Sequence, residues 1–324
     1  MSNSLPEMIT ELRKAPQVAL FSHVSPDGDC MGSMLALGLA LEKLNKQIYF
    51  FNPDPVPSYL AFLPGANRVN STLPVNWSEV LVFVDCTDIE RTSLTPQDLP
   101  FESLVLNLDH HISNSSFGHI NVIDPQASAS GELVFTLIKE LGVELDKDIA
   151  TNLYTAIVTD TGSFQYSNTT AQTHRVVAKL IDQKIELETI HSSLFDQKPL
   201  AHIKLLQRAL ASLQLFSDGQ IALMILSNQD FIECGAGENL SEGLVNHART
   251  IEGVEVAILI RERDSMSVKV GLRSNLWLNV NEVAAIFQGG GHKRAAGCSL
   301  KLPLAEAQVV VLKAVQEALI GRSH

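Results

Sequence analysis

Short apolar runs alternate with longer amphipathic segments in the first half of the chain. The apolar runs have the length of buried strands, and the segments between or after them have the spacing of helices. This alternation predicts an α/β domain with a mostly parallel five-stranded sheet flanked by helices. The predicted strands span residues 17–22, 47–52, 80–85, 103–109 and 119–123, and the predicted helices span 30–45, 130–142, 148–162 and 173–183.

The character of the pattern changes after the first half. Residues 189–213 are polar and helical, with an interruption at Pro199, and are predicted to form a connector. Beyond them, strand-like runs are separated by helical segments, and a short turn between two runs predicts a hairpin. We therefore predict a domain over 1–188, a helical linker over 189–213 and a smaller α/β domain with a mixed sheet over 214–324. Its predicted strands are 221–227, 255–262 and 267–274, and its predicted helices are 238–248, 279–287 and 304–320.

The composition is that of an ordinary globular protein, with 45% hydrophobic and 19% charged residues among 324. A net charge of −12 argues against non-specific attraction to long nucleic acids, so a phosphate ligand must be met by local cations. No apolar run has the length of a membrane span or the pattern of a secretory leader. The four cysteines show no paired spacing, which indicates free thiols in a reducing compartment. We therefore expect a cytoplasmic protein that does not bind membranes.

Ionisable side chains follow several of the predicted strands. A carboxylate or an Asp-His-His cluster stands at the end of three strands, and another carboxylate ends a predicted helix. In an open α/β sheet functional groups collect beyond the carboxyl ends of the strands, so these groups are expected to converge. Each one alone is explained as a turn or a helix cap, but so many like charges share one site only if cations neutralise them. The residues are His23, Asp27, Asp29, Asp85, Asp109, His110, His111 and Asp160.

Carboxylates and imidazoles without paired cysteines favour a divalent cation that prefers oxygen ligands. Such a set of donors suits Mn²⁺ or Mg²⁺, with Mn²⁺ more tolerant of histidine, and it leaves Zn²⁺ and Fe²⁺ open. The ligands are too many for one ion, whereas two ions roughly 3.5–4 Å apart and bridged by one carboxylate would use them all. Two such ions generate a hydroxide nucleophile and bind a phosphoryl oxygen. We therefore predict a two-metal phosphoester hydrolase.

The predicted C-terminal domain offers separate groups that suit an anion. Gly289, Gly290 and Gly291 would let the backbone approach a phosphate closely, and His292 would donate a hydrogen bond to it. Arg273, at the end of a predicted strand, is a further candidate for a phosphate contact. A tight helix-to-strand turn for the glycines and a surface salt bridge for Arg273 are the alternative interpretations.

Together these motifs resemble the DHH phosphoesterase superfamily, in the branch that carries a DHH-associated C-terminal domain. The resemblance extends over nearly the whole chain, and the order of the motifs across two predicted domains makes it specific. It rests on Asp85 and on four motifs, which are HxxPDGD at 23–29, DHH at 109–111, DTGSF at 160–164 and GGGHKRAAG at 289–297.

The resemblance implies a division of the metal ligands between two ions. The positions of His23, Asp27 and Asp85 correspond to ligands of one Mn²⁺ in the family. Asp85 would also bridge to the second ion, so the expected cofactor is a pair of Mn²⁺ ions, with Mg²⁺ or another divalent ion as a substitute. The positions that correspond to ligands of the second Mn²⁺ are Asp29, Asp85, His110 and Asp160.

The resemblance also implies catalytic and substrate-binding roles. His111 would face the scissile phosphate without binding a metal, and Asp109 would support the cluster from behind. In the C-terminal domain, residues 289–291 and His292 would close over the substrate, and Arg273 would hold its phosphate. The substrate cleft is then expected between the two domains, with the connector as the hinge.

The size and the two-domain layout look most like the NrnA-type oligoribonucleases, which also dephosphorylate 3′-phosphoadenosine-5′-phosphate (pAp). The resemblance therefore implies hydrolysis of short RNA or DNA to mononucleotides and of pAp to AMP, by in-line attack of a metal-bound hydroxide. An acidic chain fits a substrate of a few nucleotides and not a long duplex. Whether the chain forms a homodimer is left open.

Other activities of the superfamily remain as alternatives. Hydrolases of cyclic-di-AMP or of linear pApA have nearly this architecture. RecJ-type exonucleases are longer, and manganese pyrophosphatases carry a basic SRKKQ-like segment where this chain has GGGH. A nucleotide sensor that has lost catalysis is a further alternative, against which the complete set of ligands argues.

Overall fold

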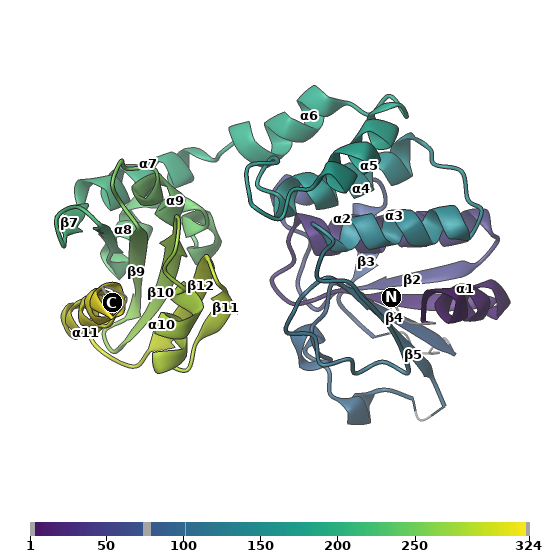
Figure 1. Cartoon of the computed structure of the whole chain (residues 1–324), viewed down its shortest axis with the longest axis horizontal. Helices are drawn as coiled ribbons and strands as arrows, with labels where there is room; N and C mark the ends of the chain where they lie inside the picture. The colour runs from purple at the N-terminus through teal and green to yellow at the C-terminus, as the bar shows by residue number, and fades with distance from the viewer. Residues whose placement is uncertain (1–3, 74–78, 101, 322–324) are drawn as a thin grey trace. The chain divides into compact units, whose positions relative to one another are not determined.

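The chain divides into two units, Met1–Gln197 and Lys198–His324, which we call unit 1 and unit 2. The computed structural model describes residues 4–73, 79–100 and 102–321 (Figure 1). The division falls within the stretch predicted as a connector. In the described part of the chain, no helix combines the length and the apolar character that spanning a bilayer requires.

Unit 1 contains a parallel sheet, as the alternating pattern predicted. Its order is β3-β2-β1-β4-β5-β6, and every recorded pair of strands is parallel. Within the described residues the sheet has six strands and not the five predicted, because the two-residue edge strand β3 is too short to show a pattern. The strands are β1 Gln17–Phe21, β2 Gln47–Phe51, β3 Val69–Asn70, β4 Val80–Val84, β5 Leu104–Asp109 and β6 Ile120–Ile123.

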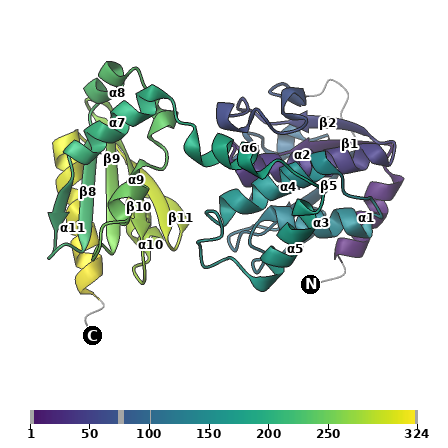
Figure 2. The ribbon, with the colours of Figure 1, turned by 90° about the horizontal axis from the view of Figure 1, so that it is seen from above.

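The two faces of this sheet are covered differently. Leu20, Val82 and Leu106 point into a large core that the helices of unit 1 close, and Figure 2 shows α2 to α5 together over the strands. Phe21 and Phe83 point to the opposite face, where they pack under the segment between β4 and β5, which forms the short 3-10 helices η3 Glu90–Thr92 and η4 Pro96–Asp98. The helices are α1 Ser4–Lys14, α2 Gly28–Lys43, α3 Ser130–Glu140, α4 Lys147–Asp160 and α5 Ala171–Ile181.

Close packing of α2 against α4 depends on glycine. A Cβ added to Gly32 would lie 2.4 Å from the carbonyl oxygen of Asn152, and one added to Gly28 would lie 2.4 Å from Oγ1 of Thr159. The two backbones therefore approach more closely than side chains would allow. This approach places the start of α2 beside the end of α4, where Asp160 lies.

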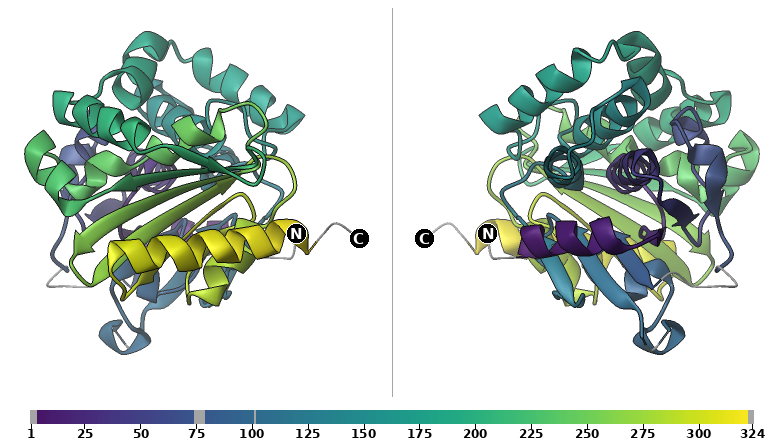
Figure 3. Two further views of the ribbon diagram at one scale, coloured as in Figure 1. Left: turned by 90° about the vertical axis from the view of Figure 1, so that its left-hand side faces the viewer. Right: turned by 90° about the vertical axis from the view of Figure 1, so that its right-hand side faces the viewer.

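Unit 2 contains the mixed sheet that the sequence predicted. Its order is β11-β12-β10-β9-β8-β7, with β8 parallel to β9 and the other pairs antiparallel. One face packs against α10 and α11 and the other against α7, α8 and α9, and Figure 3 shows α11 lying along the sheet. The elements are α7 Leu200–Ala211, β7 Gln214–Phe216, β8 Ile221–Leu226, α8 Asn228–Cys234, α9 Leu244–Arg249, β9 Val256–Asp264, β10 Ser267–Ser274, α10 Val280–Ile286, β11 Gly290–His292, β12 Ala295–Leu300 and α11 Leu304–Ile320.

The second half differs locally from what the sequence predicted. The glycine segment is more than the helix-to-strand turn of the alternative interpretation, because Gly290–His292 is strand β11, paired with β12. Residues 238–248 are not one helix, because Gly243, with φ +79°, separates the 3-10 helix η6 Glu238–Ser241 from α9. Strand β12 and helix α8 were not predicted. Around Pro199, which caps α7, lie α6 Leu187–His191 and the π-helical turn η5 Ser192–Asp196.

Candidate metal centre

The candidate metal centre of unit 1 lies where the three central strands end. Strands β1, β4 and β5 are neighbours in the sheet, and each leads into predicted ligands. Helix α2 begins and helix α4 ends beside them, so the start of α2 contributes two carboxylates and the end of α4 contributes one. The eight predicted residues are His23 after β1, Asp27 and Asp29 at the start of α2, Asp85 after β4, Asp109, His110 and His111 at the end of β5, and Asp160 at the end of α4.

Backbone carbonyls orient the two histidines at the centre of this group. Nδ1 of His23 lies 2.8 Å from the carbonyl oxygen of Val24, and its Nε2 lies 3.4 Å from Oδ2 of Asp85 and 3.8 Å from Oδ2 of Asp27. A carbonyl oxygen only accepts, so Nδ1 must carry the hydrogen. Burial lowers the pKa of His23, but Cys30 and Asp85 outweigh it and raise that pKa to about 12. A metal ion at Nε2 would therefore take the place of a proton, and the lone pair of the neutral ring would point at it.

His110 repeats this arrangement on the other side of Asp85. Its Nδ1 lies 3.2 Å from the carbonyl oxygen of Ala127. Its Nε2 is buried and makes no hydrogen bond with any group in the described part of the chain. The nearest carboxylate oxygens to Nε2 lie at 3.6 Å in Asp160, 3.7 Å in Asp29 and 3.8 Å in Asp85.

These contacts fit divalent cations better than hydrogen bonds. A lone pair on nitrogen repels a carboxylate oxygen, but both bind a cation that lies between them, at distances near 2.0–2.2 Å for common divalent ions. Within the described residues, three groups each offer ligand atoms that lie within 4.8 Å of one another. The groups are His23 with Asp27 and Cys30, Asp85 with His110 and His111, and Asp29 with His110 and Asp160.

Proton affinities in this cluster show how strongly its charges interact. Burial first, and then the charge of Asp85, raises the pKa of Asp29 well above its usual value. Burial likewise raises the pKa of Asp160 to about 7. Burial opposes ionisation of Asp85 as well, but His23 and the two neighbouring histidines outweigh it and hold the pKa of Asp85 below its usual range. Without cations, the cluster therefore retains protons that bound metal ions would displace.

Asp85 occupies a strained position between the two histidines. Its φ of +59° lies in the left-handed region, which residues other than glycine seldom adopt. Its Oδ1 accepts a hydrogen bond of 2.8 Å from Oγ of Ser130, while its Oδ2 faces His23. Strain of this kind persists where surrounding structure maintains it, and it concentrates at functional sites.

Asp27 and Asp29 also serve as helix caps, as the alternative interpretation of such residues proposed. Oδ1 of Asp27 accepts a hydrogen bond from the backbone of Cys30 and caps α2, while Oδ2 faces His23. Asp29 accepts hydrogen bonds from the backbone N–H groups of Ser130 and Gly131 at the start of α3. Capping fixes the direction of these carboxylates, so it is compatible with a role as ligands.

Asp109 orients His111. Its Oδ1 lies 2.8 Å from Nδ1 of His111 and also accepts the backbone N–H groups of His110 and His111. Its Oδ2 accepts a hydrogen bond of 2.6 Å from Nδ2 of Asn114. Burial lowers the pKa of His111, but the bond to Asp109 and the charge of Asp85 outweigh it and raise the pKa to about 9.

Several contributors to the cluster were not predicted from the sequence. Ser130 binds Asp85, Asn114 binds Asp109, and Nδ2 of Asn168 lies 3.3 Å from Oδ2 of Asp160. Serine and asparagine are too common in turns for such roles to stand out in a sequence. Cys30, expected to be a free thiol, belongs to one of the candidate groups, and burial raises its pKa to about 12.

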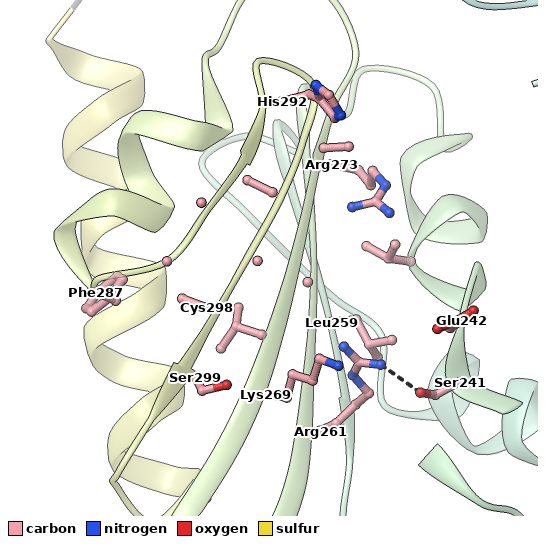
Figure 4. Close-up of a pocket in the computed structure, with 18 of the residues that line it drawn as sticks. Ser241, Glu242, Leu259, Arg261, Lys269, Arg273, Phe287, His292, Cys298 and Ser299 are labelled. Carbon is pink, nitrogen blue, oxygen red and sulfur yellow. Dashed lines mark hydrogen bonds between the residues drawn. The ribbon is translucent and has the colours of Figure 1, made fainter. Parts of the chain in front are cut away.

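The predicted substrate-binding residues lie in unit 2, around a pocket of about 960 Å³ (Figure 4). Arg273, Gly289, Gly290 and His292 line it, whereas Gly291 does not belong to the recorded lining. Two further cations, Arg261 and Lys269, line the same pocket and were not predicted.

Comparison with known proteins places these features in a family. Residues 17–157 match the DHH family, N-terminal domain, and residues 231–320 match the DHHA1 domain. The bifunctional oligoribonuclease and PAP phosphatase NrnA of Thermus thermophilus is 35% identical over 316 residues, which cover 96% of this chain and 94% of that protein. The Bacillus subtilis protein of the same name is 28% identical over 299 residues, covering 91% of this chain and 92% of that protein.

A solved structure agrees with this assignment. The exopolyphosphatase-related protein from Bacteroides fragilis superposes with a TM-score of 0.89 at 26% identity and covers 98% of this chain and 96% of that one. The matched segments fall in both units, and the Asp109-His110-His111 motif lies at the candidate metal centre. The chain therefore belongs to the DHH family of phosphoesterases and carries a C-terminal DHHA1 domain.

Proposed function

We propose that this chain is a Mn²⁺-dependent phosphodiesterase and phosphatase that hydrolyses short RNA or DNA to mononucleotides and pAp to AMP. The observation that carries the proposal is the paired orientation of His23 and His110. Each ring has Nδ1 on a backbone carbonyl and directs Nε2 at carboxylate oxygens 3.4–3.8 Å away. The names of the Thermus and Bacillus relatives support the choice of substrates.

The ligands are proposed to divide around Asp85. Its Oδ2 faces His23 and its Oδ1 lies 3.8 Å from Nε2 of His110, which supports a bridging role for this carboxylate. His23, Asp27 and Asp85 would hold one ion. Mn²⁺ fits a mixed set of imidazoles and carboxylates better than Mg²⁺ does. The ligands of the second ion would be Asp29, Asp85, His110 and Asp160.

Catalysis would combine these ions with the Asp109–His111 pair. Two bound divalent ions supply an acidified water and neutralise charge on the phosphoryl oxygens. Because Nδ1 of His111 is held by Asp109, a contact between His111 and a substrate phosphate must come from Nε2. A raised pKa favours the protonated ring, which donates a hydrogen bond to a phosphate or leaving-group oxygen.

Short substrates fit the distribution of charge. The chain has a net charge of −12, and its proposed phosphate contacts in unit 2, Arg273 and His292, line a pocket and not a long basic groove. We further propose a cytoplasmic location, which the four free, buried cysteines support.

A panel of substrates tests the proposal. Protein loaded with Mn²⁺ would be incubated separately with pAp, pApA, cyclic-di-AMP, pyrophosphate, RNA of two to five nucleotides and RNA of 24 nucleotides, and kcat/KM would be compared. We expect the short RNAs and pAp to be hydrolysed most efficiently. A preference for the long strand, for cyclic-di-AMP or for pyrophosphate would replace the proposed substrate with that one.

A further inference from the structure

The pocket of unit 2 has a floor of glycine. In the register of the sheet, Gly290 of β11 pairs with Gly297 of β12, and Gly297 pairs with Gly271 of β10. All three glycines line the pocket, so a row that crosses three neighbouring strands carries no side chains on the pocket surface. A nucleoside or a sugar-phosphate backbone can therefore approach the sheet closely along this row.

Candidate phosphate-binding residues stand on both sides of the glycine row. On one side are Arg273 of β10 and His292 of β11, and on the other are Lys269 of β10 and Arg261 of β9, as Figure 4 shows. Lys269 and Arg273 are four residues apart on one strand, which separates their backbones by roughly 13 Å. The guanidinium of Arg261 leans toward the row, since its Nη2 would lie 4.0 Å from a Cβ added to Gly271.

Arg261 and Lys269 are placed where their charges repel. They are direct partners in the antiparallel register of β9 and β10, an arrangement that is unfavourable for like charges. In the described part of the chain, neither has a carboxylate oxygen within 4.0 Å. Nη1 of Arg261 donates to Oγ of Ser241 at 2.8 Å, but its buried Nε has no hydrogen-bond partner among the described residues.

Two other arginines of unit 2 do have ion-pair or hydrogen-bond partners. Arg263, two residues further along β9, forms an ion pair of 2.9 Å with Glu238, and Arg294 donates to the carbonyl oxygen of Leu278. Among the described residues that line the pocket, Glu242 supplies one carboxylate, against three cationic side chains from Arg261, Lys269 and Arg273. A partly buried guanidinium that stands opposite a lysine, with no carboxylate partner among the described residues, therefore points to an anionic ligand.

We propose that Arg261 and Lys269 form a second phosphate subsite, separate from Arg273 and His292. A linear ligand with at least two phosphates would place one at each end of the pocket and a nucleoside over the glycine row. We identify this ligand as a phosphorylated oligonucleotide of two or more nucleotides. Only this identification rests on the proposed function. The end of the pocket that holds Arg261 and Lys269 would then help to determine the length of the substrate.

Equilibrium binding to metal-free protein tests the subsite without hydrolysis. The dissociation constants of a 5′-phosphorylated RNA trimer and of AMP would be measured in the presence of a chelator, for wild type, Lys269→Gln and Arg261→Gln. We expect each substitution to lower the preference for the trimer over AMP by at least about tenfold. It should also reduce the slope of log K against log salt for the trimer by about 0.7.

Arg263→Gln is the matched control, because it removes the same charge from the same strand at an ion-paired position that lines a different pocket. It should leave the preference for the trimer unchanged. An unchanged preference in both subsite variants, or an equal loss in the control, would overturn the proposal. Lys269 is exposed, so its variant decides the question even where Arg261→Gln fails to fold.

The two proposals fail in different ways. If wild-type protein binds the trimer through this subsite but hydrolyses no short RNA with Mn²⁺, the proposed function is wrong and the subsite stands. If it hydrolyses short RNA and neither variant changes the preference for the trimer, the subsite is wrong and the proposed function stands.

Discussion

Nε2 of His110 lies 3.6 Å from Oδ2 of Asp160, although 50 positions separate the two residues in the chain. The distance is too long for a hydrogen bond and suits two ligands of one cation. It joins the end of β5 to the end of α4, the helix that packs closely against α2. The candidate metal centre is thus produced by the packing of helices as well as by the order of strands.

Asp85→Asn should abolish binding of both ions and nearly all hydrolysis. The amide keeps the shape of the carboxylate and suits the left-handed backbone, but it removes the charge that faces both His23 and His110. The loss should exceed the roughly 10–100-fold effect of a residue that only orients a ligand. Metal content after dialysis and kcat on short RNA measure it. Near wild-type turnover would reject the bridging role.

Asp88→Asn is a suitable control for that variant. Asp88 follows the same strand, and its carboxylate accepts hydrogen bonds from Thr87 and from the backbone of Arg91. Among the described residues, Asp88 belongs to none of the three groups that could hold a metal ion. We expect metal content and kcat close to those of the wild type.

His111→Ala should slow turnover while leaving both metals bound. Nδ1 of His111 lies 2.8 Å from a carboxylate oxygen of Asp109, whereas Nδ1 of His23 and Nδ1 of His110 lie against backbone carbonyls. Loss of an acid or base typically lowers kcat by about 10²–10⁴. Asp109→Asn should reproduce part of this loss and add little to it in the double variant. Metal stoichiometry reduced to one ion in His111→Ala would instead identify this residue as a ligand.

Metal affinity should weaken as pH falls below about 7. Burial raises the pKa of Asp160 to about 7, so below that pH the carboxyl is neutral and a metal ion must displace its proton. The apparent affinity should fall at least about tenfold for each pH unit in this range, since Asp29, whose pKa burial also raises, must lose its proton as well. Competition with a coloured chelator between pH 5.5 and 8.5 measures the slope. An affinity that does not change between pH 5.5 and 7.5 would contradict the assignment of Asp160.

Gly32→Ala should reduce both stability and metal affinity. Its Cβ would lie 2.4 Å from the carbonyl oxygen of Asn152, so α2 and α4 would have to separate. Overpacking of this kind costs about 1–3 kcal/mol, and the shift would carry Asp29 away from Asp160. Urea unfolding and metal titration test this. Gly321→Ala, whose Cβ would lie 3.4 Å from the carbonyl oxygen of Glu317, should change neither.

Much of the fold followed from hydrophobic periodicity, and the exceptions have physical reasons. The buried strand Val80–Val84 is apolar throughout, which made it easy to predict. Strand β3 has two residues and β11 has three, two of them glycine, so neither shows the alternation that marks a strand. Their existence depends on a neighbouring strand that supplies the hydrogen bonds.

The candidate site was predictable only in part. Aspartate and histidine at strand ends stood out because burying them needs a partner. Ser130 could not be identified, because its contact with Asp85 depends on the position of α3. Likewise, the opposition of Arg261 and Lys269 appears only once the register of β9 and β10 is known.

The most direct test of the account is a metal titration of chelator-treated protein, with bound ions and hydrolysis of a short RNA followed in the same samples. The account predicts negligible activity without metal, binding of two Mn²⁺ per chain and recovery of activity only as the second ion binds. Full activity in rigorously metal-free protein would contradict it, and so would saturation by a single ion.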